Sequence, residues 1–144
     1  MSAYVIDASV AIKWVIDEEG TQGALALRRH PLAAPDLLIA ECANILWKKV
    51  RRGELASDEA ALAAGLLARA DLDLMPMRPY LEAATRIAIA LDHPAYDCIY
   101  LAMAEAEGMT FVTADERLLR KVRQDTSGRF APCVMSLAEM GASH

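Results

Sequence analysis

The chain has 144 residues, a length that suits one domain with a single core. At 55% hydrophobic and 24% charged residues it has enough apolar side chains to bury that core, which excludes an intrinsically disordered protein. The net charge of −5 disfavours a general nucleic-acid binder, a class that is commonly basic, unless several of the acids gather around a cation.

The cysteines and the N-terminal residues indicate where the protein works. Cys42, Cys98 and Cys133 are odd in number, widely spaced and set among apolar residues, as expected of free buried thiols in a reducing compartment. The first residues run directly into a strand pattern, which predicts no signal peptide. No uncharged apolar run approaches the ~20 residues that span a bilayer. We therefore expect a cytoplasmic protein without a membrane segment.

The first part of the chain reads as a strand followed at once by a helix. Residues 4–6 are a short apolar run that stops at Asp7, and Ser9 is a candidate N-cap for the helix that follows. A buried strand that ends in an acid and turns into a helix begins an α/β unit. The helices predicted in this part cover 9–15, 21–29 with Thr21 as its cap, and 35–52 with Gly53 as the residue after its end.

The remainder of the chain continues this alternation. The elements predicted are a helix over 57–70, a strand over 72–77, helices over 80–91 and 96–107, a strand over 110–113, a helix after Asp115, a strand over 132–135 and a short helix capped by Ser136. There is no linker, repeat or low-complexity tract. This order predicts a single α/β domain over residues 1–144 with a mostly parallel sheet.

Four carboxylates stand out because they lie within apolar pattern. Asp7 and Asp115 each come just after a predicted strand, where ligands bind in parallel sheets. Glu41 shares a helix face with the apolar residues one turn before and after it, and Asp97 lies one turn before Leu101 on an inward stripe. A buried ionised carboxylate must be paired or ligate a metal, since burying it alone costs several kcal/mol.

Each acid also has a structural alternative. Asp115 and Asp97 are both well placed to cap their own helices. Taken together, however, four such acids without a matching inward stripe of Lys or Arg favour a shared cation. Oxygen ligands without His or Cys indicate Mg²⁺ or Mn²⁺ rather than zinc. A carboxylate cage around such an ion suits phosphoryl chemistry.

Other candidate groups are less specific. His30 and His93 both precede proline in loops, and both are expected on the surface. Trp14 and Trp47 could stack on bases, although packing in the core or an interface is the commoner use. Two basic groups could hold RNA phosphates or could be solvated helix ends. They are Lys48, Lys49, Arg51 and Arg52 late in the Glu41 helix, and Arg117, Arg120, Lys121 and Arg123 after Asp115.

These segments together resemble a known family. The segments that carry the resemblance are 5–10 (Val-Ile-Asp-Ala-Ser-Val), 35–44 with Glu41, 96–102 (Tyr-Asp-Cys-Ile-Tyr-Leu-Ala) and 113–115 (Thr-Ala-Asp). In this order the chain resembles the PIN-domain family over nearly its whole length, and most of all the VapC toxins of bacterial and archaeal toxin–antitoxin pairs. Cys98 stands where an alanine is usual, a small change beside the third acid.

The resemblance implies a three-layer α/β/α sandwich with a Mg²⁺- or Mn²⁺-dependent endoribonuclease site. Asp7, Glu41 and Asp97 match the three central acids of the family, and Asp115 matches a fourth, more variable one. Asp7, Asp97 and Asp115 are thereby expected to hold the metal, while Glu41 ligates it or orients the attacking water. The positions that match supporting polar residues are Ser9, Asn44 and Thr113. The resemblance also implies a homodimer and a VapB-type antitoxin as partner.

Three other functions are possible for an acid at the end of a strand. A haloacid-dehalogenase-like phosphatase needs a second aspartate two residues after Asp7, where this chain has Ser9. A receiver-like phosphoacceptor module, which would also bind Mg²⁺ beside Asp7, calls for a lysine that ends a late strand, whereas Met135-Ser136-Leu137 follows the last predicted one. An inactive PIN-like binding scaffold has no use for all four acids.

Overall fold

A single parallel sheet forms the centre of the computed structural model, which describes residues 3–142. Its strands lie in the order β3-β2-β1-β4-β5, and every neighbouring pair is parallel. The strands in the described residues are β1 (Tyr4–Ile6), β2 (Leu32–Pro35), β3 (Asp73–Met75), β4 (Thr110–Thr113) and β5 (Val134–Ser136). The predicted mostly parallel sheet is confirmed, and it is parallel throughout.

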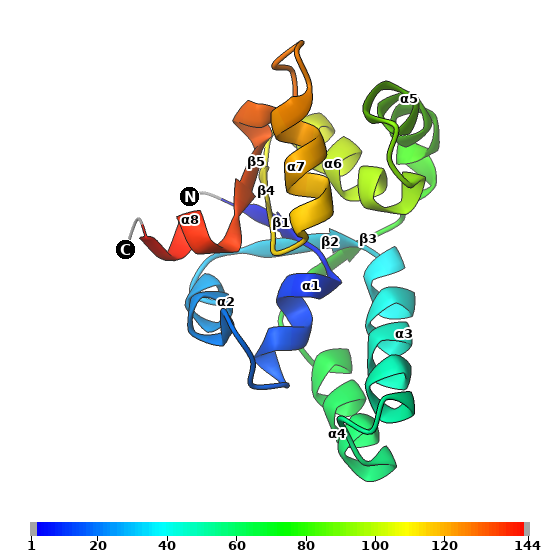
Figure 1. Ribbon diagram of the computed structural model, residues 1–144, viewed down its shortest axis with the longest axis vertical. Coiled ribbons are helices and arrows are strands. Elements are labelled where there is room, and N and C mark those ends of the chain that lie inside the picture. Colours follow the sequence, from blue (N-terminus) through cyan, green and yellow to red (C-terminus); the bar gives the residue numbers. More distant parts are fainter. Residues whose placement is uncertain (1–2, 143–144) are drawn as a thin grey trace.

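Helices cover both faces of the sheet (Figure 1). In that view α1 to α4 lie below β1 and β2, whereas α5, α6 and α7 lie above these two strands, so the predicted three-layer α/β/α sandwich is confirmed. The α-helices of the described residues are α1 (Ala8–Ala11), α2 (Thr21–Leu27), α3 (Leu37–Arg51), α4 (Ser57–Ala68), α5 (Leu81–Leu91), α6 (Ala95–Glu107), α7 (Glu116–Gln124) and α8 (Leu137–Ala142). Short 3₁₀ turns are η1 (Ile12–Trp14), η2 (Arg78–Tyr80) and η3 (Ala131–Cys133).

The order of the strands creates a switch point beside β1. From β1 the chain moves outward to β2 and β3, and it then returns to the other side of β1 to form β4. Val5 is therefore paired with Ala33 on one side and with Phe111 on the other. Ligands of parallel sheets bind at the carboxyl ends of strands where the order reverses in this way. The residues that follow β1 and β4, Asp7 and Asp115, meet at this point.

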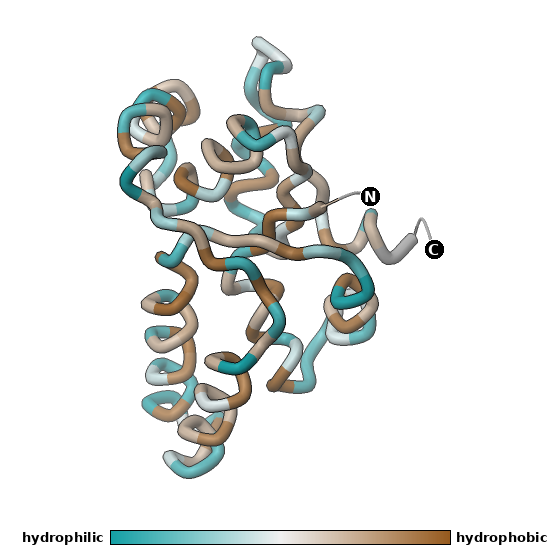
Figure 2. The backbone as a smooth tube through the Cα atoms, turned by 180° about the vertical axis from the view of Figure 1, so that it is seen from behind, coloured by the Kyte–Doolittle hydropathy of each residue, from teal (hydrophilic) through white to brown (hydrophobic). Residues whose placement is uncertain are grey.

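The core lies on both faces of the central strands. Val5, Ile6, Phe111 and Val112 are completely buried, as expected of strands covered by helices on both sides. Figure 2 shows the turns of α3 alternating between hydrophobic and hydrophilic segments, the pattern of a helix that buries one face. The face of α3 that packs inward carries Leu38, and Glu41 lies beside it at the edge of the core.

Several local predictions differ from the structure. Strand β2 was not predicted, and Pro35 ends this strand instead of opening α3. Ser9 does not cap α1, because Asp7 occupies that position with an extended backbone, and Gly20 rather than Thr21 precedes α2. The predicted ends of α3 and α6 are correct to within a residue or two, since Gly53 and Gly108 both adopt positive φ angles just beyond them.

The described residues also test the expected sites of the thiols. Cys42 and Cys98 are buried as expected, whereas Cys133 is half-buried, and all three are free.

Within residues 3–142, no helix combines the length and apolar character that crossing a membrane requires.

Candidate metal centre

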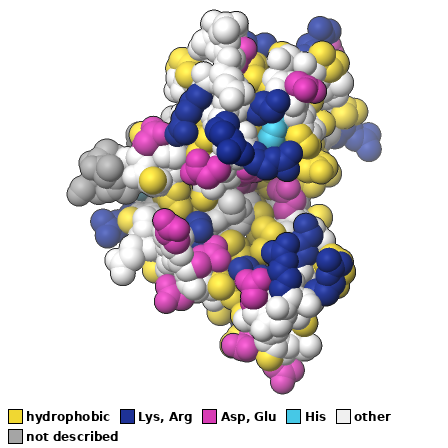
Figure 3. Space-filling view, in the orientation of Figure 1, with side chains coloured by type: hydrophobic (Ala, Val, Ile, Leu, Met, Phe, Trp, Pro, Cys, Tyr) yellow, Lys and Arg dark blue, Asp and Glu magenta, His cyan; other side chains and the backbone are white. Residues whose placement is uncertain are grey.

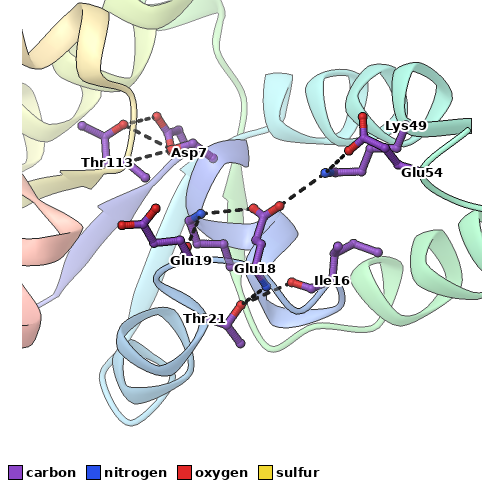
Figure 4. A network of polar contacts seen from close by, with 11 residues as sticks. Asp7, Ile16, Glu18, Glu19, Thr21, Lys49, Glu54 and Thr113 are labelled. Atoms are coloured by element: carbon purple, nitrogen blue, oxygen red, sulfur yellow. Dashed lines mark hydrogen bonds and ion pairs between the residues drawn. The ribbon is translucent and has the colours of Figure 1, made fainter. Parts of the chain in front are cut away.

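Asp7 is a buried carboxylate at the end of β1, with 6% of the residue exposed. Both of its oxygens accept hydrogen bonds from hydroxyl groups. Ser9 donates to Oδ1 at 2.5 Å and Thr113 donates to Oδ2 at 2.5 Å, and Figure 4 shows Thr113 directed at Asp7 from β4. Burial raises the pKa of Asp7 to about 7, and the charges of Asp115 and Glu41 add to that rise against the opposing effect of the two hydroxyls.

The two hydroxyls are themselves fixed by the backbone after β4. The amide of Ala114 donates to Ser9 Oγ at 3.0 Å, and the amide of Asp115 donates to Thr113 Oγ1 at 3.0 Å. Each hydroxyl therefore accepts from an amide and gives its own proton to Asp7. Ser9 and Thr113 therefore both contact the carboxylate of Asp7, and Ser9 lines the same pocket as Asp7.

Glu41 reaches the same place from α3. Its carboxylate accepts a hydrogen bond from the hydroxyl of Tyr100, a buried residue of α6. Burial raises the pKa of Glu41 against the opposing effect of the Tyr100 hydrogen bond, and the charges of Asp97 and Asp115 raise it further. Burial beside Glu41 also raises the pKa of Tyr100, so its phenol remains a protonated donor.

Asp97 lies in the first turn of α6 against a buried histidine. Its Oδ2 is 2.6 Å from Nε2 of His93, whose side chain is only 3% exposed. The predicted surface position of His93 is therefore wrong. The cause is the turn between α5 and α6, where Asp92 has a φ angle of 52°. Pro94, and not Asp97, holds the N-cap position of α6. This turn carries the imidazole inward.

The fourth acid, Asp115, is shared between a helix cap and the cluster. Its Oδ1 accepts from the amides of Arg117 at 3.0 Å and Leu118 at 3.3 Å, which confirms that it caps α7. It nevertheless stays close to the other acids, because one ligand atom each of His93, Asp97 and Asp115 lies within 4.8 Å of the other two. Burial, and then the Asp115 charge, raise the pKa of Asp97.

All four predicted acids line one pocket of about 510 Å³. Asn44, one turn beyond Glu41 on α3, also lines it, and so do Lys48 and Tyr96. The four acids that the sequence singles out, which follow β1, lie on α3 and α6 and precede α7, therefore meet in one pocket.

The electrostatics of this pocket suit a divalent cation. Among the described residues, no lysine or arginine forms an ion pair with Asp7, Glu41, Asp97 or Asp115, and the one such partner of Asp97 is His93. Several carboxylates that are partly desolvated, close together and without a lysine or arginine partner form an oxygen-rich environment of the kind that Mg²⁺ and Mn²⁺ prefer, and His93 adds one nitrogen to the possible ligands. The residues therefore fit a hard metal ion.

Comparison with known proteins identifies the family. Residues 4–124 match the PIN domain. A ribonuclease of Pyrobaculum aerophilum named VapC3 is 35% identical over 122 residues, which cover 81% of this chain and 92% of that protein. The chain belongs to the PIN-domain family.

Solved structures show that this PIN domain shares its fold across distant sequences. PAE2754 from Pyrobaculum aerophilum has a TM-score of 0.70 at 24% identity and covers 98% of this chain and 90% of that one. VapBC2 from Rickettsia felis, bound to a DNA fragment from their promoter, has a TM-score of 0.62 at 12% identity over 93% of this chain and 98% of that one.

The surface of the PIN domain around the pocket is basic in two places. Figure 3 shows Lys and Arg side chains over α3 and over α7, with acidic side chains between them. Not every predicted RNA-contacting residue is free to act there. Lys49 is bound to Glu18 at 3.3 Å and to Glu54 at 3.6 Å, a network visible in Figure 4. Trp47 is 52% exposed beneath Arg51, so it is not a core residue.

Two residues of this PIN domain were missed as partners of the acids. His93 is four positions before Asp97, a spacing that would have suggested contact if the turn at Pro94 had been read as continuous with the helix. Tyr100 lies three residues after Asp97 on the same helix face, and a tyrosine within apolar pattern needs a partner for its hydroxyl. The partner proves to be Glu41, on another helix.

Proposed function

We propose that this chain is a Mg²⁺- or Mn²⁺-dependent endoribonuclease and the toxin of a VapBC-type toxin–antitoxin pair. We further propose that residues 1–144 act as a single nuclease domain in the cytoplasm. The observation that carries the proposal is the meeting of Asp7, Glu41, Asp97 and Asp115 in one pocket without a lysine or arginine partner among the described residues. The relationship to a ribonuclease of the same family supports it.

In this proposal Asp7, Asp97 and Asp115 hold the metal. When bound, the ion would neutralise the charge of the scissile phosphate and lower the pKa of a coordinated water. Ser9 and Thr113 hold both oxygens of Asp7, so that its carboxylate cannot rotate away from the pocket. Glu41 accepts from Tyr100 through one oxygen, and its other oxygen can ligate the ion or orient the attacking water.

The basic groups beside the pocket are proposed to hold the RNA backbone. Lys48 lines the pocket itself, one turn beyond Asn44 on α3. Arg51 and Arg52 continue that helix, and Arg117 and Arg120 lie on α7 at the other side. Lysine and arginine contacts to phosphates position a strand without reading its sequence. The proposed substrate is therefore RNA, with no particular sequence assigned.

Two protein partners are proposed. The first is a VapB-type antitoxin, because the structure of VapBC2 from Rickettsia felis has the same fold. The second is another copy of the chain. Leu81 and Ile89 on α5 are 66% and 77% exposed, and large apolar side chains on one helix face favour an interface. Light scattering of the purified protein tests the homodimer, and a monomeric mass would contradict it.

Cleavage of a circular single-stranded RNA tests the enzymatic proposal, because an exonuclease needs a free end. We expect the wild type to cut it with Mg²⁺ or Mn²⁺ and to fail with EDTA. Asp7→Asn should abolish cutting while its circular dichroism spectrum stays unchanged. Asp73→Asn is the matched control, because Asp73 is exposed on β3, the edge strand two places away from β1.

Five results would contradict the proposal. Wild-type cutting by Asp7→Asn would refute the role of the pocket, and cutting in EDTA would refute the metal. Degradation of linear RNA but not of circular RNA would show that the activity is that of an exonuclease and not of an endonuclease. Incubation with acetyl phosphate and Mg²⁺ tests the receiver-like alternative, which predicts a stable aspartyl phosphate on Asp7, and a folded wild type that cuts no RNA would favour the inactive scaffold.

A further inference from the structure

We propose that Tyr100 is a positioning residue whose hydroxyl holds Glu41 in the orientation that the metal pocket needs. This inference rests on the proposed function, because the orientation of Glu41 matters only if the pocket binds a metal ion. Tyr100 does not line the pocket and is 0% exposed, so it acts through the glutamate rather than on a substrate.

The geometry ties two helices together at the pocket. Tyr100 belongs to α6 and Glu41 to α3, 59 positions apart in the chain. The phenol hydroxyl donates to Oε1 of Glu41. Within residues 3–142 no hydrogen bond reaches Oε2 of this glutamate, which leaves that oxygen available to the pocket that Glu41 lines.

The tyrosine is well suited to fix a second side chain because it is fixed itself. Its ring stacks on Phe111 of β4, with the ring centroids 5.6 Å apart and the planes inclined by 11°. Phe111 is completely buried in the central sheet. Glu41, by contrast, is a half-buried side chain with several rotatable bonds at the rim of the pocket. The hydrogen bond therefore restrains the mobile group by attaching it to the rigid one.

Glu41 differs in this respect from the acid at the end of β1. Asp7 has a short side chain that two hydroxyls hold next to the sheet. Glu41 has one hydrogen bond among the described residues, the one from Tyr100. Removing that donor should release the glutamate while leaving the packing of the aromatic ring intact. Partners of this kind typically change metal affinity or activity 10–100-fold, roughly, when they are removed.

A double-mutant cycle on Mn²⁺ binding tests the proposal with the full chain in the absence of RNA. The variants are wild type, Tyr100→Phe, Glu41→Gln and the double substitution, and the readout is the electron paramagnetic resonance signal of free Mn²⁺. We expect Tyr100→Phe to weaken binding about tenfold in the wild type. In the Glu41→Gln background it should change binding by less than about twofold, because the two residues act as one unit.

Tyr80→Phe provides a matched control. The Tyr80 hydroxyl donates to the exposed Glu107 at 2.9 Å, so this substitution also breaks a tyrosine–glutamate hydrogen bond made by a buried tyrosine, but outside the pocket. Its Mn²⁺ affinity should equal that of the wild type. Thermal melting shows whether each variant is folded, and a loss of affinity that follows melting temperature in both tyrosine variants would overturn the proposal.

The remaining outcomes separate this inference from the proposed function. If the wild type binds Mn²⁺ and Tyr100→Phe binds it equally well, the role of Tyr100 is refuted and the nuclease proposal stands. Equal losses with and without Glu41 would also refute it, because Tyr100 would then act by another route. A folded wild type that binds no Mn²⁺ would overturn both proposals together.

Discussion

Asp7 is an acid whose pKa the fold raises to near neutral pH in the absence of metal. Two hydroxyls stabilise its charged form, yet burial and the neighbouring charges of Glu41 and Asp115 outweigh them. The pKa of Asp7 is raised from 3.8 to about 7. At a pH between these two values, the folded chain still binds a proton on this carboxyl group, whereas the unfolded chain has already released it. The metal-free protein should therefore lose stability as the pH rises.

The first prediction is that Asp7→Asn stabilises the metal-free protein at alkaline pH. The penalty on the wild type grows as the pH rises from about 4 and is complete above the folded pKa of about 7. It amounts to at most about 4 kcal/mol for this shift. Urea unfolding in EDTA between about pH 5 and about pH 8 measures the difference between the two proteins. A difference that does not change with pH would contradict the raised pKa.

At this scale the sequence predicts the acids better than their partners. Asp7, Glu41, Asp97 and Asp115 were found because a carboxylate within apolar pattern is conspicuous in a single sequence. A histidine in a loop before proline is expected on the surface, whereas His93 is buried. Its direction depends on a left-handed turn at the preceding aspartate, and no periodicity reports such a turn.

At the scale of elements, the start of α7 joins a structural role to a chemical one. Asp115 accepts from two amides of the first turn through one oxygen. An aspartate at this position satisfies donors that have no partner within the helix. The same residue lies near Asp97 and His93 in the acidic cluster. Substitutions that keep the cap but remove the charge can separate these roles.

The second prediction compares Asp115→Ser with Asp115→Ala. Serine caps helices about as well as aspartate, so Asp115→Ser should unfold at nearly the wild-type urea concentration. Asp115→Ala should lose about 1 kcal/mol of stability. Both should weaken Mn²⁺ binding to the same extent, because neither retains a carboxylate. Retention of wild-type Mn²⁺ affinity by either variant would show that Asp115 is a cap alone.

The elements themselves were predictable where local signals are strong. Gly53 and Gly108 mark the ends of two helices because glycine readily adopts the positive φ of a helix terminus. The missed strand β2 reads Leu-Ala-Ala-Pro, and alanine and proline are poor strand formers. It becomes a strand because β1 and β3 pair with it on both sides and helices bury it, so tertiary contacts override propensity.

At the scale of the whole molecule, a net charge of −5 conceals an uneven distribution. Acids gather in the pocket, while lysines and arginines lie over α3 and α7 on either side of it (Figure 3). Bound metal would reduce the negative charge of the pocket. The negative net charge argues against a general nucleic-acid binder. It is nevertheless compatible with a basic surface that holds phosphates next to a metal-dependent site.

The third prediction concerns the salt dependence of RNA binding by the Asp7→Asn protein, which should bind without cutting. Affinity for a single-stranded RNA, measured by fluorescence anisotropy between about 50 and 200 mM salt, should fall linearly on logarithmic axes. Lys48→Gln should reduce the slope by about one, because Lys48 is exposed and lines the pocket. Lys49→Gln is the control. It should leave the slope unchanged and lower stability instead, because the Lys49 ammonium is already bound to Glu18 and Glu54. Equal slopes for the Lys48 variant and its parent would assign that lysine to the solvated end of a helix, whereas a change with Lys49→Gln would show that RNA displaces its ion pairs.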